Sequence, residues 1–118
     1  MSVHVPPAPA AVAVACRELG WDAGRIVIAS GFTSRLLGLI PASRGLAPDP
    51  GVLAFPACAS VHTCFMGAPC EVAFADDDGR VLLVCLLAPW GRAACPAASF
   101  ALERLAPARR QASRAGNL

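Results

Sequence analysis

The stretch CEVAFADDDGRVLLVCLL, residues 70–87, decides the predicted fold of this chain. Its first part, Cys70–Ala75, alternates in side-chain character as a β-strand does. One face of that strand carries Cys70, Val72 and Phe74. The dipeptide Asp78-Gly79 favours a type I′ turn, which needs positive φ at both central positions. The return strand, Arg80–Leu87, is apolar on both faces, so we expect an antiparallel hairpin whose second strand is central and covered on two sides.

Strands also dominate the rest of the predicted elements. Arg25–Ala29 is short, rich in β-branched residues and bounded by Gly24 and Ser30, which is typical of a strand. Gly51–Phe55 is a second short strand, and Ser99–Leu105 is predicted as a last strand or a short helix. Pro89–Pro96 is predicted as a loop.

One helix is expected, over Phe32–Ile40. Apolar side chains recur on one face at helical spacing, and Pro41 is expected to end the helix. The apolar residues of that face are Phe32, Leu36, Leu39 and Ile40. Together the elements predict an α+β fold.

Composition limits the classes of protein that fit. A chain of 118 residues with 56% apolar and 15% charged residues is a single domain with a well-filled core. The net charge of +2 is too small to imply a nucleic-acid partner. No lysine is present, which excludes a Walker phosphate loop and a Schiff base, and no stretch approaches the roughly 20 apolar residues of a transmembrane helix.

The N-terminal residues 1–24 are predicted as a flexible arm rich in proline and alanine, in which Ala10–Leu19 adds a helical turn or two. The domain itself is expected to cover residues 25–118. The apolar run that ends at Cys16 resembles a poor lipoprotein cleavage box, but no basic residue precedes it and prolines interrupt its start. We therefore expect a cytoplasmic protein with reduced cysteines, with an exported form as the alternative.

The segment Pro56–Met66 carries the candidate chemistry. In an extended conformation its side chains alternate between two faces. One face carries Cys58, Ser60, His62 and Cys64, and the other carries Ala57, Ala59, Val61 and Thr63. In a helix, Cys58 and His62 still share a face at positions i and i+4. The segment thus predicts that Cys58 and His62 lie together in either conformation.

Three interpretations of this segment remain open. The first is a buried strand whose cysteines fill space and whose histidine is hydrogen-bonded in the core. The second is a catalytic or redox thiol at Cys58 activated by His62, since an imidazole near a thiol favours the thiolate. The third is a zinc site formed by Cys58, His62 and Cys95, with Cys64 as a fourth candidate, although the cysteine spacing is wider than in zinc knuckles.

Several blocks of this sequence resemble a known family, the domain of unknown function 192, in its short bacterial and archaeal form. The blocks are Phe32–Leu39, Cys58–Thr63, Phe65-Met66, Pro69 before a strand, Phe74 through Asp78–Val81, and Pro89-Trp90 ahead of Cys95. The resemblance covers residues 25–118, and the Ser-Val-His-Thr block with Met66 is its most specific part. The sequence departs from the family pattern at Cys70, at Gly67 and at the C-terminal Gly116-Asn117-Leu118.

The resemblance implies a compact, β-rich α+β domain with a curled, mostly antiparallel sheet or partial barrel and one or two packed helices. It implies no established reaction or cofactor, and an accessory role near an envelope, secretion or pilus assembly only by association. A non-enzymatic binding module is therefore the first functional hypothesis, and a cysteine- and histidine-centred enzyme is the second. The candidate ligand-binding residues are Ser60, Thr63, Met66, Glu71 and Trp90.

Overall fold

A computed structural model describes residues 9–29 and 38–107 of the chain, and within them it contains seven strands and two helices. In chain order these are α1 (Pro9–Leu19), β1 (Ile26–Ile28), α3 (Ile40–Ser43), β2 (Val52–Pro56), β3 (Ser60–His62), β4 (Cys70–Ala75), β5 (Val81–Leu87), β6 (Arg92–Ala94) and β7 (Phe100–Leu105). The predicted α+β class is confirmed.

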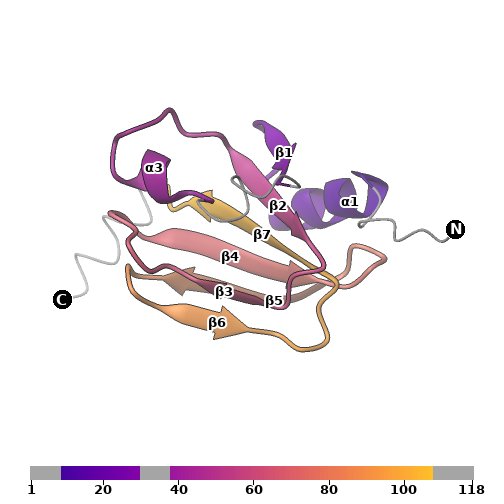
Figure 1. Ribbon diagram of the computed structural model, residues 1–118. Coiled ribbons are helices and arrows are strands. Elements are labelled where there is room, and N and C mark those ends of the chain that lie inside the picture. The colour runs from indigo at the N-terminus through magenta and orange to yellow at the C-terminus, as the bar shows by residue number, and fades with distance from the viewer. Residues whose placement is uncertain (1–8, 30–37, 108–118) are drawn as a thin grey trace, which may run out of the picture.

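Five strands form one sheet in the order β1-β2-β7-β4-β5, and β3 pairs with β6 in a separate two-stranded ribbon (Figure 1). The pair β1–β2 is parallel and the other pairs are antiparallel. The sheet is therefore mixed but mostly antiparallel, as predicted. It is open rather than closed into a barrel.

The sheet has a helix on one face and the ribbon on the other. Side chains alternate along β2, β4 and β7, so each strand contributes to both apolar clusters. The cluster beside α1 contains Ala11, Val12, Ala15, Cys16, Trp21, Val52, Ala54, Ala73, Ala75, Phe100 and Leu102. The cluster beneath the ribbon contains Ala29, Leu39, Leu53, Phe55, Val61, Met66, Cys70, Val72, Phe74 and Ala101. The prediction that Cys70, Val72 and Phe74 share one face of β4 is thus confirmed.

The β4–β5 hairpin is confirmed, but its turn is not type I′. Asp77 and Asp78 both have negative φ, and only Gly79, at φ +88°, lies in the left-handed region. The Gly79 amide donates to the Asp76 carbonyl at 3.0 Å, and the Asp76 amide donates to the Arg80 carbonyl at 3.0 Å. This is a three-residue connection, with a type I turn followed by a left-handed glycine. The Asp76 side chain stabilises this longer loop by accepting hydrogen bonds from the Asp78 and Arg80 amides.

The prediction that Arg80–Leu87 is a central strand is wrong. β5 lies at the edge of the sheet, and Leu82, Leu83 and Val84 are 39%, 38% and 49% exposed. The central position next to β4 belongs to β7 instead, although β7 carries Glu103 and Arg104. Strand composition predicts burial, but the pairing of distant segments decides which strand is central.

The N-terminal segment differs from the predicted arm over the residues described. α1 is eleven residues long, and Ala15, Cys16 and Trp21 are buried against the sheet. Pro9 begins the helix, a position where its missing amide hydrogen costs nothing, and alanine is the strongest helix former. The packed domain therefore extends back to Pro9, beyond the predicted boundary at residue 25.

The predicted helix Phe32–Ile40 lies mostly outside the described residues. Of its apolar face, Leu39 is buried and Ile40 is half-buried. Pro41 was predicted to end a helix, but it lies in the first turn of the short helix α3 instead. Proline is tolerated there because the first amides of a helix have no partner within it.

Two further predictions concern the C-terminal third. Ser99–Leu105 contains a strand, β7, which resolves the strand-or-helix alternative. Pro89–Pro96 is not entirely a loop, because Arg92–Ala94 forms β6 and pairs with β3. None of the helices in residues 9–29 and 38–107 has the length and apolar character needed to span a bilayer.

Candidate functional site

The central part of the segment Pro56–Met66 is extended rather than helical, because Ser60–His62 forms β3. In β3, Ser60 and His62 are exposed, whereas Val61 and the following Thr63 are buried. The alternation ends on both sides, because Ala57 has φ +52° and Phe65 has φ +67°. The polar face therefore spans Ser60 and His62 only.

Cys58 and His62 nevertheless reach the same small cavity, of about 130 Å³. Its wall comes from α3, β2, β3 and β7 and from the residues beside them. The lining residues are Gly38, Leu39, Ile40, Phe55, Cys58, Ser60, Val61, His62, Met66 and Glu103. A second hollow, of about 300 Å³, is lined by His62 together with Cys64, Trp90 and Arg92. His62 therefore lines two concavities.

The hydrogen bonds of this face go to the backbone. The Cys58 thiol donates to the Ser60 carbonyl at 3.1 Å. His62 Nδ1 accepts a hydrogen bond from the Cys64 amide at 3.3 Å. Neither contact activates the sulfur.

The hypothetical zinc ligands do not gather in the described residues. Cys95 is held at the end of the ribbon, where its amide donates to the Ala59 carbonyl at 2.8 Å, and its side chain packs against the core. It lines neither concavity beside His62. Cys58, His62 and Cys95 therefore do not bring three ligand atoms together within the ranges described. All six cysteines are unbridged.

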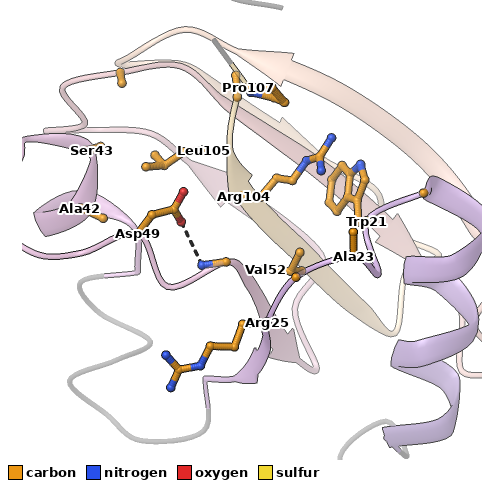
Figure 2. Close-up of a pocket in the computed structure, with 15 residues that line it drawn as sticks. Trp21, Ala23, Arg25, Ala42, Ser43, Asp49, Val52, Arg104, Leu105 and Pro107 are labelled. Carbon is orange, nitrogen blue, oxygen red and sulfur yellow. Dashed lines mark hydrogen bonds between the residues drawn. The ribbon is translucent and has the colours of Figure 1, made fainter. Parts of the chain in front are cut away.

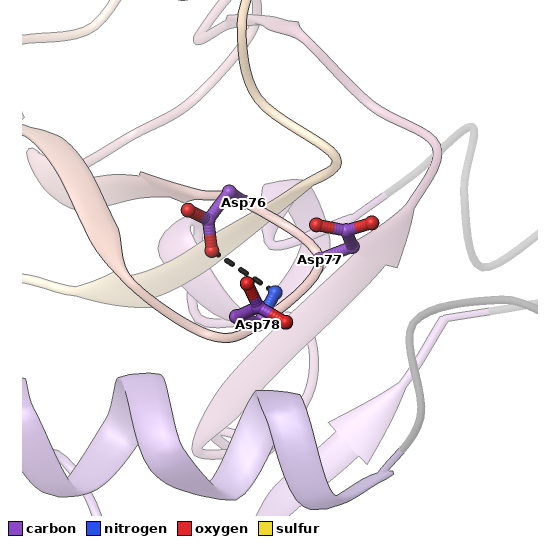
Figure 3. Close-up of side chains that lie close together, drawn as sticks. All are labelled: Asp76, Asp77 and Asp78. Carbon is purple, nitrogen blue, oxygen red and sulfur yellow. Dashed lines mark hydrogen bonds between the residues drawn. The ribbon is translucent and has the colours of Figure 1, made fainter.

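The three aspartates of the β4–β5 turn are the one group of potential metal ligands that does gather within the described ranges (Figure 3). Asp76 Oδ1 accepts hydrogen bonds from the Asp78 amide at 3.0 Å and from the Arg80 amide at 2.9 Å. These bonds stabilise the turn, as the sequence indicated. The cluster has a structural role.

Thr63 fixes the loop that carries Trp90. Its hydroxyl donates to the Ala88 carbonyl and accepts from the Gly91 amide, both at 2.7 Å. Trp90 has φ +65° and is 64% exposed, and its ring contacts the ring of Phe65, also exposed, at a centroid distance of 4.8 Å. Of the two candidate ligand-binding residues here, Thr63 is buried and structural, whereas Trp90 is open to solvent.

We expect Thr63→Val to destabilise the protein by about 1–3 kcal/mol, because the Ala88 carbonyl and the Gly91 amide each lose a buried partner. Chemical denaturation of the variant measures this loss. Thr63→Ser keeps the hydroxyl and should recover most of it. Equal losses in the two variants would mean that the hydroxyl contributes little.

Glu71, another candidate, faces α1 rather than the His62 cavity. It lies directly opposite Arg104 on the neighbouring strand, and Arg104 Nε donates to Glu71 Oε1 at 2.7 Å. The Arg104 guanidinium also lies over the Trp21 ring, 4.5 Å from its centroid. Two contacts thus hold the Arg104 side chain in one place.

The sequence did not identify Glu103 as a candidate site residue, because no pairing partner was predicted for the segment Ser99–Leu105. Glu103 lies on the opposite face of β7 from Arg104, between Leu53 and Val72, and is 9% exposed. Burial in this apolar environment raises the pKa of its carboxyl from 4.5 to about 7. A third titratable side chain therefore lines the cavity of Cys58 and His62.

A larger concavity, of about 450 Å³, lies elsewhere, on the side of the sheet where Arg104 and Trp21 lie. We call it the Arg104 pocket. Its polar walls come from Trp21, Arg25, Ser43, Asp49 and Arg104. Figure 2 shows Arg104 beside Trp21, with Asp49 across the pocket and Arg25 at its lower rim. Asp49 Oδ1 accepts a hydrogen bond from the Gly51 amide at 2.9 Å, so one oxygen of this carboxylate already has a backbone partner.

Comparison with known proteins finds no matching family model, no matching curated protein and no matching solved structure. The resemblance to the domain of unknown function 192 therefore stays a prediction. The function is argued below from the geometry of the chain itself.

Proposed function

We propose that this chain is a non-enzymatic binding module and that it holds a small organic anion in the Arg104 pocket. The observation that carries the proposal is a guanidinium fixed in advance at the wall of a cavity of ligand size. Small-molecule sites usually have volumes of about 300–1,000 Å³, and the Arg104 pocket lies within that range at about 450 Å³.

The fixed position of Arg104 favours anion binding for an entropic reason. Ordering a free arginine costs conformational entropy, and here Glu71 and Trp21 already hold the side chain. The ion pair uses Nε, while the guanidinium has further N–H groups in the fork geometry that suits a carboxylate or phosphate.

The charged residues that line the pocket also favour an anion. They are two guanidiniums and one carboxylate, Asp49, whereas Glu71, which pairs with Arg104, is not a lining residue. Arg25 is exposed and forms no ion pair with any residue in the described ranges. An anion entering the pocket would therefore meet Arg25 at the rim and Arg104 at the wall.

The enzyme hypothesis at Cys58 and His62 has less support. The cavity beside them measures only about 130 Å³, and the hydrogen bond from the Cys58 thiol goes to the Ser60 carbonyl. The association with an envelope, secretion or pilus assembly, and the cytoplasmic location, stay predictions. The binding proposal does not depend on either.

Titration with inorganic phosphate and with citrate, followed by two-dimensional ¹H–¹⁵N NMR, tests the proposal. We expect saturable shifts of the Trp21 indole and of the Gly24 and Gly51 amides, which line the pocket. Arg104→Lys keeps a positive charge beside Glu71 but loses the fork, so affinity should fall by about tenfold or more.

Arg25→Gln should also weaken binding, whereas Arg80→Gln on the distant hairpin is the matched control and should leave it unchanged. Shifts that do not saturate, or that are equal in all three variants, would overturn the proposed function.

A further inference from the structure

The edge strand β5 has features of an interaction surface rather than of a protected edge. The strand sequence, Val81–Leu87, contains seven apolar residues and neither charge nor proline. Natural edge strands usually carry charged residues or proline, or are very short, because their free backbone groups otherwise pair with another chain. The one protective device present is a bulge near Leu82. From Leu83 to Leu87 the strand is regular.

Both faces of β5 are open to solvent. Leu83 lies opposite Phe74 and therefore faces the side of the ribbon, whereas Val84 lies opposite Ala73 and faces the side of α1. All the same, Leu83 is 38% exposed and Val84 is 49% exposed. The two outer layers thus reach the ends of β5, at Val81 and Leu87, and leave Leu82, Leu83 and Val84 exposed between them.

The charges at the two ends of β5 indicate what pairs with it. Before the strand, the turn carries Asp76, Asp77, Asp78 and Arg80, with a net charge of about −2 at neutral pH. After the strand comes an uncharged connection and then Arg92 in β6. A second copy in antiparallel orientation would place its acidic turn beside the basic end of the first. A parallel copy would place like charges together.

We propose that two copies of this chain associate through β5, as an antiparallel pair about a two-fold axis near Val84. Such a pairing is isologous, because each copy presents the same apolar rows and the same free backbone edge. It joins the two five-stranded sheets into one continuous sheet. It also removes the exposed parts of Leu83 and Val84 from water.

Sedimentation equilibrium of the full chain, over a range of concentrations at moderate salt, tests the proposal. The chain is expected to dimerise reversibly, and Val84→Lys, which places two like charges across the axis, should raise the dimer Kd by about tenfold or more. The matched control is Leu46→Lys, because Leu46 is 77% exposed and lies in the connection between α3 and β2, outside the proposed interface. The control should dimerise as the original chain does.

A second variant fixes the register. In Val84→Cys, oxidation should yield a dimer in which the introduced thiols of the two copies are joined, because opposite Cβ atoms in an antiparallel pair lie about 4.5–5.5 Å apart. Mass spectrometry of the linked peptide distinguishes this bond from one that involves a native cysteine. A monomeric chain at all concentrations would overturn the proposal. So would a dimer that Val84→Lys leaves intact.

Discussion

Replacing Gly79 with alanine is expected to destabilise the domain by about 2–5 kcal/mol. Two causes add. At φ +88° a residue with a Cβ is strained, which costs roughly 1–2 kcal/mol. The new Cβ would also lie 2.5 Å from the carbonyl oxygen of Ala11 in α1, and a clash of this kind typically costs about 1–3 kcal/mol. Guanidinium unfolding measures the sum.

The matched control is Gly45→Ala. Gly45 has a similar φ of +73°, but nothing lies within 4 Å of the position that its Cβ would take. The variant should therefore show the cost of strain alone. If Gly79→Ala is no more destabilising than Gly45→Ala, then α1 does not pack against the hairpin, and the domain does not extend back to Pro9.

The second large effect concerns the pH dependence of stability. We compare the free energy of unfolding of Glu103→Gln with that of the original chain. The difference, variant minus original, is expected to be larger above pH 7 than at acid pH. The pKa of Glu103 is raised from 4.5 to about 7 by burial, so the folded state resists ionisation of this carboxyl. The penalty is absent below pH 4.5, where both states are protonated, and grows as the pH rises.

The penalty is fully present above pH 7, where it amounts to about 3 kcal/mol by linkage. Glutamine cannot ionise, so the difference in unfolding free energy between the two proteins should grow by this amount between acid and alkaline pH. Any constant cost of burying the amide cancels in the comparison. Glu18→Gln, at an exposed position of α1, is the control. A difference that stays constant across this range would mean that Glu103 is not buried as a carboxyl.

The fold class and most strand positions could be predicted because local patterns determine them. Cys70–Ala75 alternates in apolar character, and the turn residues that follow allow only a hairpin. The sheet order could not be predicted. β7 is central only because β2 and β4 come to it from different parts of the chain, and the ion pair with Glu71 makes Arg104 tolerable there.

Candidate site residues could be predicted from the sequence only where they all lie on one strand. The alternation of Ser60, Val61, His62 and Thr63 is a property of one short segment, and the structure has it. The Arg104 pocket joins Trp21, Arg25, Asp49 and Arg104 from three segments. No spacing in the sequence links them, because their proximity depends on α1 being part of the domain and on β7 being central.

The central place of β7 also has a kinetic consequence. The hairpin β4–β5 joins neighbouring segments and can form early, because closing a short loop costs little entropy. β2 has no antiparallel partner until Phe100–Leu105 is available. During synthesis Phe100–Leu105 must therefore leave the ribosome before Val52–Phe55 can be covered on that edge. A nascent chain that has not yet reached β7 keeps its apolar strands exposed to chaperones and proteases.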